Sequence, residues 1–282
     1  MRRLDRKQAP LFFGFLLIVF GSVAQPGTRN TTSQIDDHPV PKQHVRIDDV
    51  LWMKTVWQRV DLREKNNQSL YFLETPMEHR AALFDLIAQA VYDEPELKAY
   101  DLGPLGMNDM FDDPLTRSEL EGILLSRDTV RSESIYEDGV WENTVVEKRI
   151  SSTDVIAYDI KEHWFIDRNR SVMEARIVGI CPVIAVYDDY GTFKGTKRLF
   201  WLYYPELVQQ LAQWPAYNRH NDVEAMSYAR YFDDHRFSSH ITKVSNTYDR
   251  SMSSYLAPED ALVKGIETKE FLRNMEQDMW NY

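Results

Sequence analysis

Hydrophobic residues recur every three or four positions between residues 48 and 66, a spacing typical of an amphipathic helix. At about 100° per residue, six of them fall on one arc of roughly 160°: Val50, Trp52, Met53, Val56, Trp57 and Val60. Asp48 or Asp49 can cap the start of this helix. We therefore expect a buried helical face near the beginning of the folded part of the chain.

Arg63 projects into the same hydrophobic arc, beside Trp52 and Val56. An unpaired charge would be costly there, so we expect its guanidinium to have a carboxylate or several carbonyl partners, inside the chain or on a neighbouring protein. If that pair is buried, Arg63→Ala should cost on the order of 2–4 kcal/mol.

Two more helices have recognisable starts in the first half of the chain. Residues 75–78 form a capping box with proline at the first helical position, which predicts a helix over 76–92. Its expected buried stripe is Ala81, Phe84, Ile87, Ala88 and Val91. Thr116 and Glu119 repeat the capping signature and predict a short helix that ends at Leu124 or Leu125. The run 103–114 between them has the composition of a loop.

From about residue 130, the middle of the chain has the residue composition typical of β-strands. Stretches rich in Val, Ile, Tyr, Phe and Trp predict strands at 140–150, 162–167, 173–187 and 196–204. Residues 188–191 have turn composition, so the last two strands should form an antiparallel hairpin.

Helical patterns return after these strands. We expect helices at 205–213 and at 222–234, the second capped by Asp222. Pro258 opens a last helical region, which Gly265 should break before a final helix at 267–280. Antiparallel strands in the middle, packed by N-terminal and C-terminal helices, predict an α+β fold.

The N-terminus has the three parts of a secretory signal in order: basic residues, an apolar run from Leu11 to Phe20, and small residues before a cleavage site. Cleavage between Ala24 and Gln25 would remove residues 1–24. The apolar run is shorter than the roughly 20 residues of a membrane span, and an uncleaved anchor is the alternative. Residues 25–45 are polar with three prolines, which predicts a flexible lead. Residues 46–282 should form a single α+β domain, or two lobes: helical 46–127 and β-rich and helical 128–282.

The net charge limits which classes of molecule can bind the chain, and the cysteine content indicates whether a lipid can be attached. The chain has a formal charge of −11, and residues 1–24 carry four basic and one acidic side chain, so the mature part has a charge of −14. Nucleic acid and anionic membrane surfaces are therefore poor partners, and a basic protein surface is a better one. Cys181, the one cysteine, lies deep in the chain within an apolar run, where a buried inert thiol is expected and lipid attachment is not.

The sequence contains none of the common phosphate-binding, dinucleotide-binding, hydrolase or zinc-protease motifs. We therefore predict no catalytic residue, no cofactor and no metal site. His235 and His240, with Asp233, Asp234 and His220 nearby, lack the spacing of ligands on one helical turn, and we expect a solvated acidic helix end there. The chain is instead rich in aromatic residues, with 7 Trp, 15 Tyr and 13 Phe. These residues carry binding hot spots, although they also fill cores.

Three blocks of sequence resemble the GldN/PorN family, a component of the type IX secretion and gliding machinery of bacteria. They are D-x-x-W-x-K-x-x-W-x-x-x-D-L-R-E-K-N at 49–66, N-T-Y-D-R-S-x-S-x-Y at 246–255 and E-x-D-M-W-x-Y at 276–282. The blocks lie in the family's order and span nearly the whole mature chain. They supply the candidate interface and assembly residues: Trp52, Trp57, Arg63, Tyr248, Asp249, Arg250, Tyr255 and Trp280.

The resemblance implies a non-enzymatic periplasmic subunit that is attached to the inner face of the outer membrane by a lipoprotein partner, GldK/PorK-like, without inserting into the membrane itself. Copies of the subunit would form a ring that meets a GldM/PorM-like periplasmic shaft. Because copies with this charge repel one another, we expect ring closure to need a basic partner. The alternative function is a secreted hydrolase or ligand-binding protein, whose site would consist of scattered Asp, Glu and His residues that converge in space.

Overall fold

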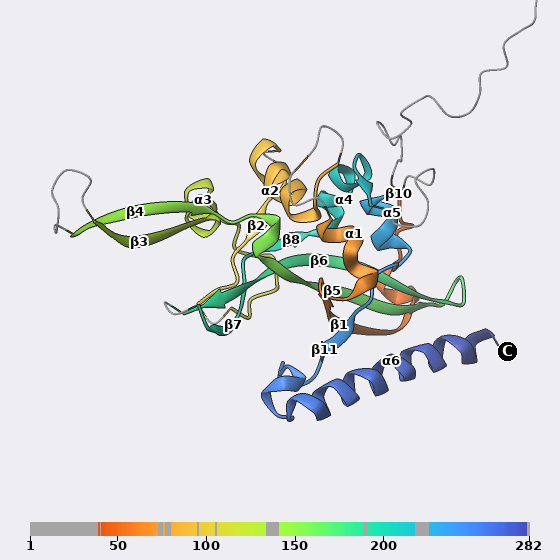
Figure 1. Cartoon of the computed structure of the whole chain (residues 1–282). Helices are drawn as coiled ribbons and strands as arrows, with labels where there is room; N and C mark the ends of the chain where they lie inside the picture. Colours follow the sequence, from red (N-terminus) through yellow and green to blue (C-terminus); the bar gives the residue numbers. More distant parts are fainter. Residues whose placement is uncertain are drawn as a thin grey trace, which may run out of the picture. The chain divides into compact units, whose positions relative to one another are not determined.

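The structure is a computed structural model that describes residues 39, 41–72, 76, 80–94, 96–104, 106–133, 141–188, 191–217 and 226–280. In this part of the chain, seven strands form one antiparallel sheet in the order β11–β1–β5–β6–β8–β2, and β7 also pairs with β6 (Figure 1). Helices from both halves of the chain pack around the sheet, so the predicted α+β fold is confirmed. The predicted signal and its cleavage site at Ala24 lie outside the described residues.

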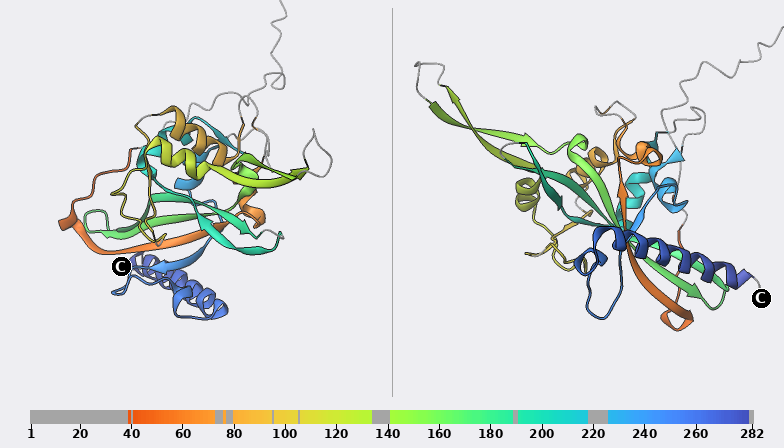
Figure 2. Two further views of the ribbon diagram at one scale, coloured as in Figure 1. Left: turned by 90° about the vertical axis from the view of Figure 1, so that its left-hand side faces the viewer. Right: turned by 60° about the horizontal axis from the view of Figure 1, so that its bottom comes forward.

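The strands of the main sheet are β1 (Val50–Asp61), β2 (Ala99–Tyr100), β5 (Val155–Asp167), β6 (Val172–Tyr187), β7 (Phe193–Arg198), β8 (Trp201–Tyr203) and β11 (His240–Val244). Two small sheets accompany it: β3 (Leu125–Glu133) with β4 (Trp141–Arg149), and β9 (Pro215–Ala216) with β10 (Met226–Ser227). The β3–β4 hairpin extends away from the main sheet (Figure 2).

The α-helices are α1 (Gln68–Tyr71), α2 (Leu83–Asp93), α3 (Arg117–Leu124), α4 (Tyr204–Ala212), α5 (Tyr228–Asp233) and α6 (Pro258–Trp280). Short 3₁₀ turns lie at Ile47–Asp49, Lys65–Asn67, Ser152–Asp154 and Met252–Ser254. In Figure 1, α2, α4 and α5 lie on one side of the sheet and α6 lies on the other. No helix in the described part of the chain has the length and apolar character needed to cross a membrane.

The first block of the chain is a strand, and the helix predicted over 48–66 is wrong. Strand β1 pairs along its length with β5 and, over residues 56–59, with β11. Val60 packs in the core under the helices, Val56 packs against Ile241 and Leu272, and Trp57 packs against Leu102. Because other elements pack on both faces of β1, its apolar residues need not alternate along the strand. Their spacing therefore happens to match the 3.6-residue period of a helix.

Several element boundaries also differ from prediction. Helix α2 begins at Leu83 rather than residue 76, and α5 begins at Tyr228, where the Ser227 hydroxyl accepts from the Arg230 amide. The predicted caps in 75–78 and at Asp222 lie outside the described residues, apart from Pro76. Strands β1, β3 and β11 and the first half of β5 were not predicted. Helix α3 with its capping box, helix α4, the 103–114 loop and a hairpin after β6 are confirmed. The strand predicted at 196–204 is instead two strands, β7 and β8, which both pair with β6.

Three apolar clusters form the core of the described chain. The largest lies between the sheet and helices α2, α4 and α5, and its members include Phe84, Tyr158, Ile180 and Phe232. A second joins Val56, Ile241, Met252 and Leu272. The third surrounds Cys181, whose thiol is buried, and burial raises its pKa far above the usual range. The predicted burial of Cys181 is therefore confirmed.

Helix α6 is continuous, so the break predicted at Gly265 is wrong. The less exposed positions of α6 recur every three or four residues, which defines the face that meets the sheet: Ala261, Gly265, Thr268, Leu272, Met275 and Met279. A Cβ atom at Gly265 would lie 2.7 Å from the carbonyl oxygen of Ile241 on β11. Gly265 therefore allows the helix to approach the strand closely rather than ending it.

We expect Gly265→Ala to lower the free energy of unfolding by about 1–3 kcal/mol, because the added methyl group overlaps the Ile241 carbonyl. Gly122→Ala in α3 is the matched control, since nothing lies within 4 Å of its Cβ position. That substitution should stabilise the protein by about 0.5–1 kcal/mol through helix propensity alone. Urea unfolding of both variants measures the difference, and a stabilising Gly265→Ala would contradict the close packing.

Candidate functional site

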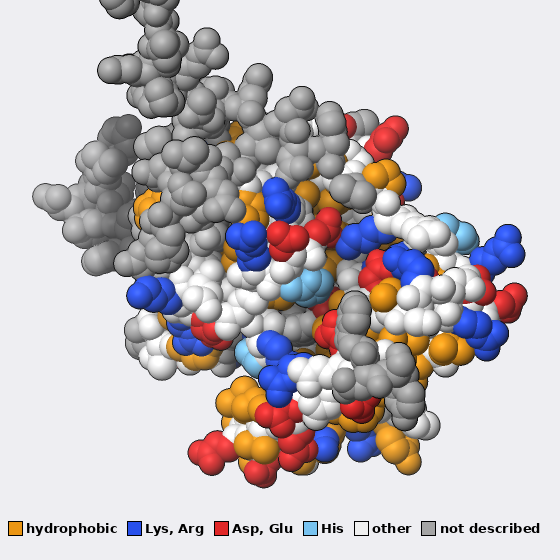
Figure 3. Space-filling model, turned by 90° about the vertical axis from the view of Figure 1, so that its right-hand side faces the viewer, with side chains coloured by type: hydrophobic (Ala, Val, Ile, Leu, Met, Phe, Trp, Pro, Cys, Tyr) orange, Lys and Arg blue, Asp and Glu red, His pale blue; other side chains and the backbone are white. Residues whose placement is uncertain are grey.

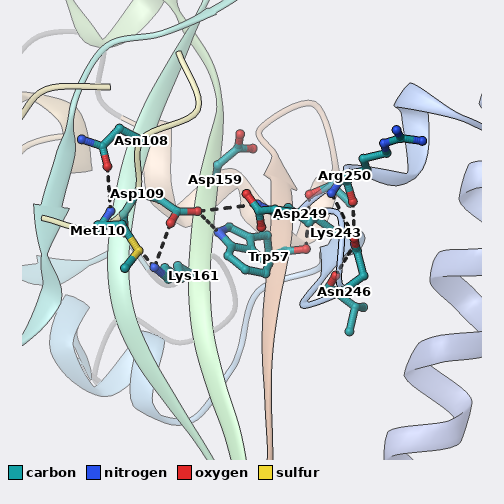
Figure 4. Close-up of polar contacts among 12 residues, drawn as sticks. Trp57, Asn108, Asp109, Met110, Asp159, Lys161, Lys243, Asn246, Asp249 and Arg250 are labelled. Carbon is teal, nitrogen blue, oxygen red and sulfur yellow. Dashed lines mark hydrogen bonds and ion pairs between the residues drawn. The ribbon is translucent and has the colours of Figure 1, made fainter. Parts of the chain in front are cut away.

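Three neighbouring strands bring a tryptophan and two lysines into one row across the sheet (Figure 4). Trp57 on β1 is the cross-strand partner of Lys161 on β5 and of Lys243 on β11. The Lys243 Nζ lies 4.2 Å from the centre of the Trp57 ring, and the Lys161 Nζ lies 5.6 Å from it. The two ammonium groups thus contact one aromatic ring from the strands on either side, which is a stabilising cation–π arrangement.

Asp109 joins this row to the 103–114 loop. Its carboxylate accepts a hydrogen bond of 2.8 Å from the Trp57 Nε1 and one of 3.0 Å from the Lys161 Nζ. Lys161 also donates to the Asp109 carbonyl oxygen at 2.7 Å, and the Lys243 Nζ lies 3.9 Å from the carboxylate. One loop carboxylate is therefore held by three side chains from three strands, and it fixes the loop against the sheet.

Asp249 joins the row to the segment between β11 and α6. Its carboxylate lies 2.6 Å from the Lys243 Nζ. Its backbone has a φ of 52°, a left-handed conformation that Asp tolerates better than most residues. The Asn246 side chain shapes the same turn, because its oxygen accepts from the amides of Tyr248 and Arg250 and its nitrogen donates to the carbonyls of Val244 and Arg250. The block at 246–255 is thus a well-organised loop.

The outer side of this loop exposes aromatic and aliphatic side chains. Tyr248 is 76% exposed, and the Arg250 guanidinium lies 5.1 Å from the centre of its ring. Tyr255 and three residues of the first turns of α6, Leu262, Val263 and Ile266, are at least half exposed. We call these five apolar residues, Tyr248, Tyr255, Leu262, Val263 and Ile266, the loop–helix surface. Figure 3 shows hydrophobic and acidic side chains mixed over the lower part of the molecule, where α6 lies.

The predicted interface residues divide into buried and exposed groups. Trp57 is buried, and Trp52 is half-buried against the Val56 cluster. Asp249 has a partner in Lys243, whereas Tyr248, Arg250 and Tyr255 lie at the surface. The side chain of Trp280, the last residue of α6, lies outside the described part of the chain. The structure therefore brings Trp57 and the 246–255 block together through Lys243, which their sequence positions did not indicate.

The expected burial of Arg63 is wrong. Its side chain is 82% exposed and pairs with Asp61, two residues earlier, at 2.6 Å. Arg63 follows the end of β1, so it leaves the sheet instead of entering a hydrophobic arc. An exposed pair of this kind contributes about 0–1 kcal/mol, well below the 2–4 kcal/mol of a buried one.

A buried carboxylate that sequence reasoning missed lies two positions along β5 from Lys161. Asp159 accepts hydrogen bonds of 2.6 and 2.9 Å from Arg59 on β1 and one of 2.6 Å from Arg198 on β7. Burial raises the pKa of the Asp159 carboxyl, but the hydrogen bonds and charges of the two arginines outweigh burial and hold the pKa below its usual value. Arg59 and Arg198 are more than 130 residues apart, so nothing in the local sequence pairs them with Asp159.

Glu162 is a second buried carboxylate that the sequence did not indicate. It accepts from the Trp164 Nε1 at 2.8 Å and from the Gln58 Nε2, and the His235 Nε2 lies 3.2 Å from its other oxygen. Burial lowers the pKa of His235, but the hydrogen bond and charge of Glu162 outweigh it and raise the pKa. The expectation that His235 lies at a solvated helix end is therefore wrong, because His235 contacts the buried Glu162. The expectation is also wrong for His240, which lies on strand β11. The described residues hold no group of three or more potential metal ligands, and His220 is outside them.

A pocket of about 470 Å³ lies between α2 and the base of the β3–β4 hairpin, and it is lined in part by Asp85, Tyr92 and Arg149. Burial raises the pKa of Asp85, and hydrogen bonds from Ser152 act against that shift. The Arg149 guanidinium lies 4.9 Å from the centre of the Tyr92 ring. One oxygen of the Asp85 carboxylate, Oδ2, is buried and has no hydrogen-bond partner among the described residues.

Comparison with known proteins gives one result that covers almost all of the described chain. A family model described as "Gliding motility associated protein GldN" matches residues 45–281. No curated protein matches the chain. The match spans β1, the charged row, the loop–helix surface and α6, so the site described above belongs to the matched region.

Proposed function

This chain belongs to the GldN family, and from that premise we propose that it works as a structural subunit rather than as an enzyme. Membership of this family implies a component of the gliding motility and type IX secretion machinery. The proposed role is that of a periplasmic ring subunit that binds a GldK/PorK-like outer-membrane lipoprotein and meets a GldM/PorM-like shaft. Its work would be to pass mechanical force through repeated protein–protein contacts.

The observation that carries this proposal is the loop–helix surface. Its tyrosines and aliphatic side chains are the kinds of residue that bury well at a protein interface, and they are exposed in the isolated chain. The loop is held beneath that surface by Asn246 and by the Asp249–Lys243 pair. Because the loop is already ordered, a partner would lose little free energy in ordering it on binding.

The charge of the chain favours a basic partner for this surface. Glu259 and Asp260 begin α6 beside the exposed Leu262 and Val263, and the mature chain carries an excess of acidic groups. A partner face with lysine or arginine around an apolar centre would match both features and would be attracted during the encounter. We assign this face to the lipoprotein, which would also hold the unlipidated subunit at the outer membrane.

Charge reversal at Arg250 tests the loop–helix surface. Arg250→Glu removes the cation that lies over Tyr248 and places a carboxylate next to Asp249. We expect co-purification with the lipoprotein to fall by about tenfold, which corresponds to roughly 1.4 kcal/mol of binding free energy, because Tyr248 loses the guanidinium beside its ring and the new carboxylate repels Asp249. The added negative charge would by itself favour a basic partner, so a loss reports on the contact made by Arg250 and Tyr248 rather than on the overall charge. The free energy of unfolding should change by less than about 0.5 kcal/mol, since the side chain lies at the surface.

Arg117→Glu in α3 is the matched control, because it makes the same charge change at an exposed arginine on another element. It should leave co-purification unchanged. Equal losses for both variants would indicate a general charge effect, and loss of folded Arg250→Glu protein would assign the loop to fold maintenance instead. Retention of the chain at the outer membrane in cells without the lipoprotein would contradict the proposed indirect attachment.

A further inference from the structure

The main sheet has an open edge along the first residues of β1. Strand β11 pairs with β1 only over residues 56–59, and the Thr55 carbonyl accepts from the Ser245 amide. Residues 50–54 therefore have β5 on one side and no described strand on the other. Leu51 and Met53 in this segment, and Ile47 just before it, are more than half exposed. An apolar strand edge of this kind is a template for another strand.

Strand β7 forms a second open edge. It pairs with β6 and with no other described strand, and four of its six residues are exposed. Phe193 at its start is more than half exposed, and its ring lies edge-on to that of Tyr187, with ring centres 6.1 Å apart. Figure 1 shows β7 and the beginning of β1 at opposite ends of the sheet.

The directions of the strands make these two edges compatible. β1 is antiparallel to β5, β5 to β6, and β6 to β7. Consequently β1 and β7 run in opposite directions within one copy. A second copy placed beside the first in the same orientation would bring its β7 antiparallel to β1, and the hydrogen-bond pattern of the sheet would continue across the boundary.

Charge favours the same pairing. Asp48 and Asp49 lie immediately before the open segment of β1 and the exposed Lys54 lies at its end, whereas β7 carries the exposed Lys194 and Lys197. The antiparallel register that places Asp49 beside Lys197 also places Met53 beside Phe193. Pairing β7 with β7 would place the lysines of two copies together, which is unfavourable for like charges on adjacent strands. Pairing β1 with β7 places acidic groups near basic ones and apolar side chains near Phe193.

We propose that copies of this chain associate head to tail, with residues 50–54 of β1 in one copy pairing with β7 of the next. Such a contact uses two different surfaces on each copy, so it propagates and can close into a ring. The inference deepens the proposed function and rests on it for the presence of neighbouring copies. It assigns the contact between copies to the sheet edges and leaves the loop–helix surface free for the lipoprotein.

Cysteine crosslinking in intact cells tests the contact where the partners are present. Met53→Cys and Thr196→Cys are combined in one full-length chain, and a bismaleimide that spans about 10 Å is added, roughly twice the spacing of neighbouring strands. The native Cys181 is buried and remains unreactive. We expect a ladder of dimers, trimers and larger species for the double variant, and no ladder for either single variant.

The controls separate the two proposals. If an amine-reactive crosslinker joins copies of the chain but the cysteine pair yields no ladder, head-to-tail edge pairing is wrong and the ring proposal stands. If neither reagent joins copies, both proposals are wrong. Dimers from Met53→Cys alone would show that β1 pairs with β1 of another copy. A crosslinked product of Met53→Cys with a different protein would show that a strand of that protein occupies this edge. Either result overturns the proposal.

Charge exchange provides an independent check in the same double-cysteine background. Lys194→Glu with Lys197→Glu should reduce the ladder by about five- to tenfold, because like charges then meet across the contact. Adding Asp48→Lys and Asp49→Lys should restore it. Failure of the second pair to restore the ladder would contradict the assigned pairing of these edges.

Discussion

Asp159→Asn is expected to lower the free energy of unfolding by about 3 kcal/mol. The Asp159 side chain is only 2% exposed and receives three hydrogen bonds from Arg59 and Arg198. Without the carboxylate, two arginines would face each other at the centre of the sheet. Since Arg59 and Arg198 are 26% and 35% exposed, water can hydrate them in part, and the cost should lie at the lower end of the range for broken buried pairs.

The same carboxylate should make stability depend on pH. Because the pKa of Asp159 is lower in the folded chain than in the unfolded chain, its contribution is fully present above the unfolded pKa of about 4. It is lost as the pH falls through the folded pKa. Urea unfolding between about pH 6 and pH 3 should therefore show a steeper loss of stability for the wild type than for Asp159→Asn.

Arg63→Ala is the matched control, since it removes an arginine from an exposed carboxylate pair. It should cost less than about 1 kcal/mol. If Asp159→Asn and Arg63→Ala lowered the free energy of unfolding by similar amounts, the claim that Asp159 forms a stabilising buried ion pair with Arg59 and Arg198 would be wrong.

Trp57→Ala is expected to cost about 3–5 kcal/mol of unfolding free energy. The ring is buried against Leu102 and Trp201, lies between two lysines, and donates to Asp109. Its removal leaves a cavity and takes away the aromatic surface that the ammonium groups of Lys161 and Lys243 contact. The 103–114 loop should loosen as a result, which hydrogen exchange of the loop amides would detect.

Trp57→Phe separates packing from hydrogen bonding. Phenylalanine keeps an aromatic ring near the lysines but has no N–H group for the Asp109 carboxylate, which remains bound to Lys161. The cost should be about 1–2 kcal/mol, mostly from the lost hydrogen bond and the smaller ring. If the wild type and Trp57→Ala were equally stable, Trp57 would not stabilise the fold. It would then be a candidate for direct contact with a partner protein.

Local sequence rules succeeded where the deciding interactions are themselves local. The capping box of Thr116 and Glu119 starts α3 because the two residues satisfy each other's backbone groups within one turn. The chain returns from β6 to β7 as predicted, and Asp188 accepts hydrogen bonds from the amides of Gly191 and Thr192. The burial of Cys181 followed from its apolar neighbours.

The candidate site could be predicted only in part. The order of residues in the three blocks indicated the family and selected Trp57 and the 246–255 segment, yet it could not show that Lys243 connects them. Asp109, Lys161 and Asp159 had no signal of their own, because a charged residue in a loop or a strand looks the same whether or not a distant partner covers it. Arg63 was misplaced because its burial depended on a helix that does not form.

The sequence by itself determined the α+β class, the capping box of α3, the β6–β7 hairpin and membership of the GldN family, since these depend on composition and on residues close together in the chain. The tertiary structure alone decided that residues 50–61 form a strand, because β5 and β11 lie about 100 and 185 residues away and their backbone hydrogen bonds outweigh the local helical spacing. It also decided that Gly265 lies inside a helix, because the reason for glycine there is the Ile241 carbonyl on another element. Contacts between distant segments carry no local pattern, so only the folded chain reveals them.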